Sequence, residues 1–93
     1  MSDEGLEGAA RIFQVLSSEN RLKILKLLRE DEMCVHDLAE ELDLTNSNIS
    51  HHLRKLKDAR VVEKRSEGKH RYYSMRDGHI ESMIAAGVEH ARE

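Results

Sequence analysis

The chain has 93 residues, of which 39% are hydrophobic and 35% charged, and only three side chains are aromatic. This length supports one domain with a modest core, to which a second copy of the chain can add stability. The single cysteine, Cys34, excludes an internal disulfide and a four-cysteine zinc site within one chain. No apolar run is long enough for a signal peptide or a membrane span, so we expect a cytoplasmic protein without a membrane partner.

The net charge of −3 conceals a strong asymmetry along the chain. Residues 1–45 have a net charge of −6, residues 46–76 of +6 and residues 77–93 of −3. An acidic protein with one basic third concentrates its positive charge for a polyanion. We therefore expect a nucleic-acid partner, the alternative being a basic face that is merely solvated.

Two helices are expected in the first third of the chain. Residues 4–16 are predicted to form the first, because their apolar residues recur on one side. Ser18 is a suitable N-cap for a second helix that ends at about Arg29. This second helix is apolar enough to be central in the core, with Arg21, Lys23 and Lys26 facing outward. The apolar side of the first helix consists of Leu6, Ala9, Ala10, Phe13, Val15 and Leu16.

Residues 34–59 have the pattern of a helix-turn-helix. A short helix is expected over residues 33–42, followed by a turn over residues 43–45 and a longer helix that Thr45 caps. The longer helix is predicted from residue 46 to about residue 59, with Ile49, Leu53 and Leu56 turned toward the core. His52 is expected to pack beside them.

The longer helix is predicted to recognise DNA. It begins with small polar side chains, which can hydrogen-bond to base edges, and it continues into cations suited to phosphates. Asparagine and serine can also simply begin a helix, but the basic flank and the preceding turn favour DNA recognition. The candidate contacts are Asn46, Ser47, Asn48, Ser50, His51, Arg54 and Lys55.

Residues 61–75 are predicted to form a β-hairpin. Two strands, over residues 61–67 and 70–75, flank a turn in which Gly68 can adopt a positive φ. A basic hairpin directly after a recognition helix is typical of a wing that reaches the DNA backbone or the minor groove and adds affinity and salt dependence. The candidate wing contacts are Lys64, Arg65, Lys69, His70 and Arg71.

Residues 77–93 are predicted to form a last helix that carries half of a metal site. His79 and His90 are eleven residues apart, so they point the same way but are separated by roughly 16 Å along the helix axis. No single ion spans that distance, because zinc-to-nitrogen bonds are about 2.0–2.1 Å. Two copies packed antiparallel bring His79 of one against His90 of the other, with Asp77 and Glu93 beside them. The pattern therefore indicates a homodimer with two shared sites.

Four stretches carry a resemblance to a known family: residues 16–25 (LSSENRLKIL), 34–39 (CVHDLA), 49–56 (ISHHLRKL) and 67–73 (EGKHRYY). In this order and spacing, the chain resembles the ArsR/SmtB family of winged-helix, metal-sensing repressors over nearly its whole length. One departure is Arg60, because the family usually has glycine after the recognition helix. If that position is left-handed, the arginine is strained by about 1 kcal/mol.

The resemblance implies a mainly α fold with a small β-hairpin: one winged helix-turn-helix domain over residues 1–93, dimeric through its N- and C-terminal helices. It also implies a homodimeric repressor that binds inverted-repeat operator DNA and releases it when Zn(II) binds. The ligands of the zinc-responsive branch correspond to Asp77 and His79 of one chain with His90 and Glu93 of the other. Two nitrogens and two carboxylate oxygens suit tetrahedral zinc, with Co(II) or Ni(II) also possible. The alternative is a pair of surface histidines on a dimer helix.

Other functions stay open at this point. Family members that sense thiophilic metals have Cys-x-Cys where this chain has Cys34 and His36, so a small residue starting the third helix is favoured there over a weak second metal site. The protein could also be a regulator of the same fold that responds to another metal or to none. A metal-buffering or interaction protein is the remaining class. An enzyme is not expected, since no nucleophile–base pair or phosphate-binding loop is evident.

Overall fold

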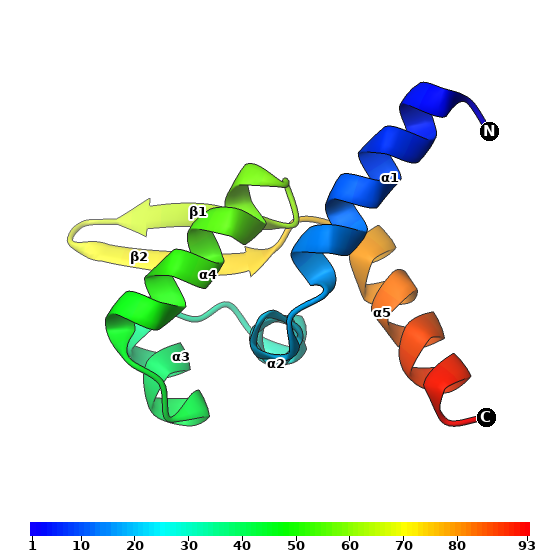
Figure 1. Ribbon diagram of the computed structural model, residues 1–93. Coiled ribbons are helices and arrows are strands. Elements are labelled where there is room, and N and C mark those ends of the chain that lie inside the picture. Colours follow the sequence, from blue (N-terminus) through cyan, green and yellow to red (C-terminus); the bar gives the residue numbers. More distant parts are fainter.

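The computed structural model describes residues 1–93 as five helices and one antiparallel hairpin (Figure 1). The order of the elements confirms the predicted winged helix-turn-helix, mainly helical with one small hairpin. None of the helices is long and apolar enough to cross a membrane. The helices are α1 (Asp3–Leu16), α2 (Glu19–Glu30), α3 (Val35–Leu42), α4 (Asn46–Asp58) and α5 (Gly78–Ala91), and the strands are β1 (Val62–Glu67) and β2 (His70–Met75).

Side-chain caps begin α2 and α4, as the sequence predicts. Oγ of Ser18 accepts a hydrogen bond from the backbone N–H of Arg21 at 3.3 Å, and Oγ1 of Thr45 accepts one from Asn48 at 3.0 Å. Each such cap stabilises its helix by about 1 kcal/mol. In the hairpin, Gly68 has a φ of 61°, the positive value expected of the glycine in the turn.

α3 begins two residues later than predicted. Met33 forms an isolated bridge with Tyr73 of β2 instead of joining the helix. Its N–H donates to the carbonyl of Tyr73 at 3.1 Å, and its carbonyl accepts the N–H of Tyr73 at 2.9 Å. Because both backbone groups of Met33 pair with β2, the helix starts only after this residue. Cys34 is then the N-cap, without a side-chain hydrogen bond.

Two residues other than glycine have a left-handed backbone. Asp43, with a φ of 55°, ends α3, and Arg60, with a φ of 60°, follows α4. Aspartate adopts this conformation readily because its short side chain can hydrogen-bond locally, whereas an arginine is strained there by about 1 kcal/mol. Arg60 therefore has the left-handed backbone for which the sequence analysis expected strain. For Asp43 the sequence predicted a turn but not this conformation.

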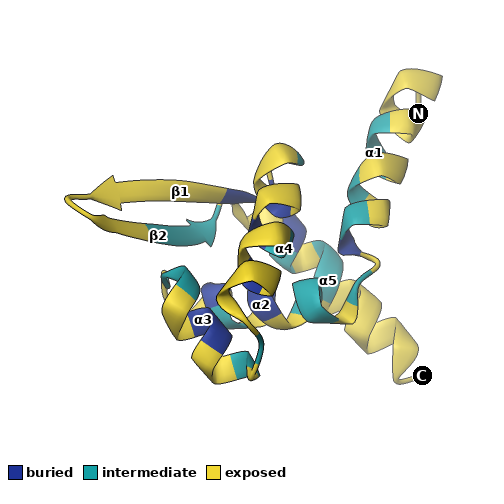
Figure 2. Cartoon of the chain, turned by 60° about the vertical axis from the view of Figure 1, so that its left-hand side comes forward, coloured by how far each residue is buried: buried dark blue, intermediate teal, exposed yellow.

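The core lies where α2, α3 and α4 meet (Figure 2). The three apolar residues of α4 that were predicted to face inward are all fully buried. Val61, just before β1, and Ile80 of α5 join the hairpin and the last helix to this core. The largest fully buried side chains are Ile24, Leu25, Leu38, Ile49, Leu53, Leu56 and Val61.

Arg21 is half-buried, although the pattern of α2 predicts that it faces outward. Its Nη1 donates to the carbonyl oxygen of Val15 at 3.0 Å, and its Nε donates to Nδ1 of His52 at 3.1 Å. The prediction is wrong because the end of α1 and the side of α4 close over this position and offer acceptors there. Arg21 thus links three helices.

α1 and α5 extend from the body of the domain on the side opposite the hairpin (Figure 1). Ile80 is the only buried residue of α5, so most of that helix stands clear of the core. Large apolar side chains are poorly covered on both helices: Leu6 is 50% exposed, Phe13 57% and Val88 53%. Leu6 and Phe13 are seven residues apart on α1, two turns of the helix, so both lie on one side of it.

Candidate functional site

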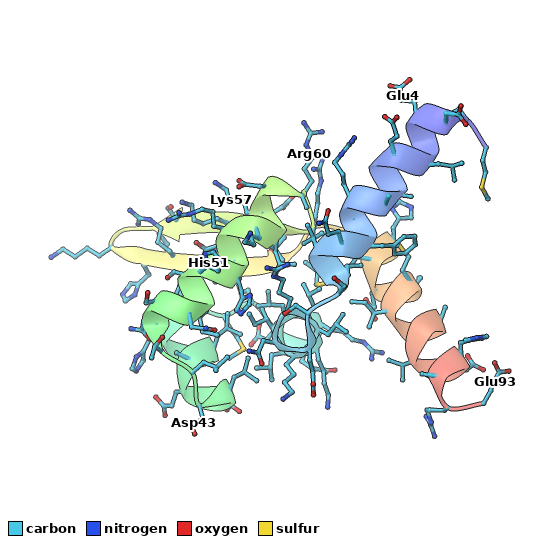
Figure 3. The ribbon with its side chains drawn as sticks, viewed as in Figure 1. Glu4, Asp43, His51, Lys57, Arg60 and Glu93 are labelled. Carbon is cyan, nitrogen blue, oxygen red and sulfur yellow. The ribbon has the colours of Figure 1, made fainter.

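α4 presents a polar and basic surface opposite its buried face. The core contacts of Ile49, Leu53 and Leu56 hold the helix in place and leave its other side in solvent. Figure 3 shows His51 and Lys57 along α4, with Arg60 just beyond its end. All seven α4 contacts predicted from the sequence are exposed: Asn46, Ser47, Asn48, Ser50, His51, Arg54 and Lys55.

The turn between α3 and α4 determines how α4 is presented. The N–H of Leu44 donates to the carbonyl of Ala39 at 3.0 Å, which closes the end of α3. Leu38 and Ala39 are buried, so α3 is packed firmly behind α4. In a helix-turn-helix of this kind, the second helix enters the major groove with its N-terminal residues against the base edges.

The hairpin carries a second group of cations. β1 and β2 are antiparallel, with Lys64 opposite Tyr73 and Arg65 opposite Tyr72. Lys64, Lys69 and Arg71 take part in no ion pair, so their charge is free for a polyanion. All five predicted wing contacts are exposed: Lys64, Arg65, Lys69, His70 and Arg71.

Arg65 differs from the other wing cations because two carboxylates bind it. Its Nη2 lies 2.6 Å from Oε1 of Glu32, and its Nη1 lies 2.6 Å from Oε2 of Glu67. The hydrogen bond from Arg65 holds the pKa of Glu32 below its usual range, and the hydrogen bonds to Glu32 and Glu67 raise the pKa of Arg65. The guanidinium carbon lies 4.9 Å from the centroid of the Tyr72 ring, a cation–π distance. No local pattern could reveal this arrangement, because Arg65 and Glu32 are 33 residues apart.

The predicted metal ligands lie in two pairs, one at each end of α5. Asp77 is the N-cap of the helix, and its Oδ1 is 3.3 Å from Nδ1 of His79. At the other end, Nδ1 of His90 is 3.2 Å from Oε2 of Glu93. The histidine side chains are 91% and 88% exposed, so both pairs face solvent. Within one chain, no group of three or more histidine, cysteine or acidic side chains is placed to hold a metal ion.

The cap of α5 also lowers the pKa of Asp77. Its Oδ1 accepts the backbone N–H of His79 at 2.9 Å, and this hydrogen bond holds the pKa of Asp77 below its usual range. The carboxylate, already charged at neutral pH as any aspartate is, stays charged further into the acid range and lies beside the imidazole ring. The sequence indicates Asp77 as a ligand but does not reveal that the same oxygen caps the helix.

The spacing within each pair is that of an ion pair, and two donors of one tetrahedral ion have a similar separation. With bonds of about 2.0–2.1 Å, neighbouring donors in a tetrahedral zinc site lie roughly 3.3–3.4 Å apart. The nitrogen–oxygen separations of 3.3 Å and 3.2 Å at the two ends of α5 are close to that value. Each end of α5 therefore carries one imidazole nitrogen beside one carboxylate oxygen.

Cys34 and His36 acquire no third donor. Cys34 is the half-buried N-cap of α3. Nε2 of His36 lies 3.4 Å from Oε2 of Glu40, one turn along the same helix. His36 is thus paired with a carboxylate of its own helix.

Comparison with known proteins identifies the family. Residues 18–64 match the sequence profile of the family described as bacterial regulatory protein, arsR family. A cadmium resistance transcriptional regulatory protein CadC homolog from Staphylococcus aureus is 39% identical over 85 residues, which are 90% of this chain and 70% of that protein. The chain belongs to the ArsR family. A transcriptional repressor SmtB homolog from Synechocystis is 33% identical over 93 residues, which are 100% of this chain and 70% of that protein.

A solved structure has the same fold as this ArsR-family chain. It is the homodimeric winged helix-turn-helix DNA-binding domain of a possible ArsR-family transcriptional regulator from Mycobacterium bovis. Its TM-score is 0.88 at 30% sequence identity, and the match covers 100% of this chain and 89% of that one. Membership of the ArsR family confirms a DNA-binding transcriptional regulator, and it confirms the expectation that the protein is not an enzyme.

His52 is half-buried against the body of this ArsR-family regulator, as its expected packing role requires. Burial lowers the pKa of His52, and the charge of Arg21 lowers it further. Because Nδ1 accepts the hydrogen bond from Arg21, the neutral ring carries its proton on Nε2. A neutral histidine therefore connects α2 to the recognition helix, a connection that the sequence does not reveal.

Proposed function

We propose that this ArsR-family chain is a homodimeric, metal-responsive repressor that releases an inverted-repeat operator when Zn(II) binds between the two α5 helices. The observation that carries the proposal is the placement of one nitrogen–oxygen donor pair at each end of α5, at tetrahedral spacing. A relative described as a cadmium resistance regulatory protein supports the metal response, and a relative described as a transcriptional repressor supports repression.

Two half-sites require two chains. An antiparallel partner brings Asp77 and His79 of one chain to His90 and Glu93 of the other, and this happens twice by symmetry. Two imidazole nitrogens and two carboxylate oxygens are a donor set that Zn(II) accepts, and Co(II) or Ni(II) can bind to it as well. The bound ion supplies a bridge between the two α5 helices.

The exposed apolar side chains of α1 and α5 support the same dimer. Leu6 and Phe13 on α1 and Val88 on α5 are each at least half exposed. Gly87, near the middle of α5, has no neighbour within 4 Å of the position that a Cβ would occupy, which leaves room for a partner helix to approach. Covering these surfaces with a second copy stabilises the dimer by about 25 cal/mol for each Å² of apolar surface removed from water.

In the proposed complex, the two α4 helices enter successive major grooves. Their spacing must match half-sites about 34–36 Å apart. The polar residues 46–51 face the bases, while Arg54 and Lys55 contact phosphates. Lys64, Lys69, His70 and Arg71 of the wing add contacts to the backbone. Figure 3 shows Glu4 and Glu93 at the far ends of α1 and α5, away from the side that carries His51, so their negative charge stays distant from the DNA.

The metal-binding helix has a direct connection to the body of the domain. Nε of Arg29, at the end of α2, is 2.7 Å from Oε1 of Glu81 in the first part of α5. α2 in turn packs against α4, so a change in the angle of α5 can alter the separation of the recognition helices. Such coupling between metal and DNA is expected to be of order 1–3 kcal/mol.

A zinc titration of DNA binding tests the proposal. The wild-type dimer is expected to bind its operator at least about fivefold more weakly with stoichiometric zinc, as the coupling energy requires. His79→Ala and His90→Ala should each abolish this response while preserving metal-free DNA binding. His36→Ala should keep the response, which separates the α5 site from a site at Cys34 and His36.

Two outcomes contradict the proposal. If operator affinity is the same with and without Zn(II), Co(II) or Ni(II), the protein is not a sensor of these metals. It is then a DNA-binding regulator that responds to none of them. A full zinc response in His79→Ala or His90→Ala removes the assignment of the site. A response to Co(II) or Ni(II) alone keeps the site and changes only the metal.

A further inference from the structure

The outer part of the wing has little to hold it in a fixed direction. Only Val62, at the start of β1, is buried, and every other side chain of that strand is exposed. On the β2 side, the backbone bridge between Met33 and Tyr73 joins the hairpin to the connection between α2 and α3. Beyond that bridge, the hairpin extends away from the helices (Figure 1).

Tyr73 and Met75 of β2 pack against the core, and one polar side-chain contact from β1 also reaches the body of the domain. Arg65 of β1 lies opposite Tyr72 of β2, and its guanidinium lies over the ring of that tyrosine. The guanidinium meets Glu32 at two points: Nη2 is 2.6 Å from Oε1, and Nε is 3.3 Å from Oε2. Paired contacts of this kind fix orientation as well as distance. Glu32 precedes Met33 in the connection between α2 and α3, so this contact joins β1 to the body across β2.

The third contact of the guanidinium lies within the wing. Nη1 of Arg65 donates to Oε2 of Glu67 at 2.6 Å, two residues further along β1. This bond cannot join the wing to the helices, but it holds the guanidinium in the direction of Glu32. All three nitrogens of Arg65 are then engaged by protein acceptors.

The charge around Arg65 disfavours a DNA phosphate. Two carboxylates surround one guanidinium, so the local net charge is negative. A phosphate would have to displace a carboxylate or approach both of them. Lys64, the next residue along the strand, is exposed and has no ion pair, which gives a matched comparison on the same element.

We propose that Arg65 is a positioning residue of the wing: through Glu32 it holds the hairpin at one angle to the body, so that Lys64, Lys69 and Arg71 meet the DNA backbone together. The proposal assigns to Arg65 no phosphate contact of its own. It rests on the proposed function in one respect, namely that the wing contributes to DNA binding.

Loss of the contact between Arg65 and Glu32 should lower DNA affinity more than folding stability. Exposed ion pairs contribute little to stability, because solvent screens them and long side chains lose freedom in forming them. A wing held in its bound direction loses less conformational freedom when DNA binds. Removing the contact should therefore weaken binding and leave thermal unfolding nearly unchanged.

The test compares alanine variants of four neighbouring charges. Glu32→Ala and Arg65→Ala each remove one side of the contact, while Lys64→Ala and Glu63→Ala remove an unpaired cation and an unpaired acid from the same strand. The probe is a fluorescent duplex that the wild-type protein enriches from random DNA, and affinity is measured by anisotropy over a series of salt concentrations. Thermal unfolding of each variant shows that it is folded.

If Arg65 acts by positioning the wing, Glu32→Ala and Arg65→Ala should have the same effect on DNA affinity. Glu32→Ala and Arg65→Ala are each expected to weaken binding roughly two- to fivefold, although one removes a negative and the other a positive charge. The double variant should lose no more than either single one. Glu32→Ala and Arg65→Ala should each leave the salt dependence of binding unchanged. Lys64→Ala should instead reduce the slope of log affinity against log salt by about one. Glu63→Ala should leave affinity unchanged or raise it.

Three results overturn the proposal. A slope reduced by about one in Arg65→Ala identifies a phosphate contact like that of Lys64. Stronger binding by Glu32→Ala shows that this carboxylate only competes with DNA for Arg65. Wild-type affinity and slope in Lys64→Ala, Lys69→Ala and Arg71→Ala alike remove the wing from the interface, and with it both this proposal and the wing contacts of the proposed function. The zinc titration involves none of these residues, so the metal response can stand or fall separately.

Discussion

Nε of Arg21 donates a hydrogen bond to Nδ1 of His52 at 3.1 Å, and this contact joins the first turn of α2 to the recognition helix. The same guanidinium donates from Nη1 to the carbonyl of Val15 at the end of α1. The contact requires a neutral His52, because a protonated imidazole has no acceptor. The packing of α2 against α4 therefore depends on the protonation state of His52.

Stability should fall in mild acid because of His52. Burial and the charge of Arg21 lower its folded-state pKa below the ordinary 6.5, so in the window just below 6.5 the unfolded chain binds more protons than the folded one. The stabilisation that neutral His52 provides is complete above about pH 6.5 and is lost as pH falls through the folded-state pKa. Urea unfolding at a series of pH values measures this loss. His52→Asn, which keeps an acceptor near Nδ1 but does not titrate, should flatten the profile, and His51→Asn serves as the control. An unchanged profile in His52→Asn would contradict the assignment.

Arg21→Met should destabilise the fold even though the substitution keeps most of the apolar stem. It leaves the carbonyl of Val15 and Nδ1 of His52 without their donor in a half-buried position. The expected cost is about 1–3 kcal/mol in the free energy of unfolding, measured by urea titration. Lys23→Met, at an exposed position on the same helix, should change stability by no more than about 0.5 kcal/mol. Equal effects of the two substitutions would show that the hydrogen bonds of Arg21 contribute nothing.

Arg60→Gly should stabilise the protein. Arg60 has a φ of 60°, where glycine avoids the strain that a side chain causes. We expect a gain of roughly 0.5–1 kcal/mol in the free energy of unfolding, reduced somewhat by the greater freedom of glycine in the unfolded chain. Ala59→Gly, one residue earlier at a φ of −84°, should instead destabilise. A loss of stability in both variants would refute the strain at Arg60.

Phe13→Glu should weaken the proposed dimer without unfolding the chain. The side chain is 57% exposed on α1, so a charge there costs little within one chain but becomes costly when a partner covers it. Sedimentation equilibrium should show a dissociation constant raised roughly tenfold or more. Gln14→Glu adds the same charge at the neighbouring exposed position and serves as the control, and circular dichroism should show unchanged helix content in both. A Phe13→Glu dimer as tight as the wild type would place α1 outside the interface.

Much of this protein is determined by the sequence through short-range physics. Caps at Ser18 and Thr45, the positive φ of Gly68 and the buried stripe of α4 depend on residues within a few positions of each other, so local patterns predict them. The concentration of basic residues over 46–76 likewise requires no fold to be recognised. The same holds for the spacing of His79 and His90, because one helix sets it.

Only the tertiary structure decided which charged side chains are engaged. The sequence pattern predicts that Arg21 faces outward and that Arg65 is a wing cation like its neighbours. In the structure, Arg21 hydrogen-bonds to His52, 31 residues away in the chain, and Arg65 to Glu32, 33 residues away. The bridge that moves the start of α3 is also long-range, since it joins Met33 to Tyr73. A hydrogen bond depends on distances of about 3 Å between atoms, and segments this far apart reach such distances only when the whole fold has packed.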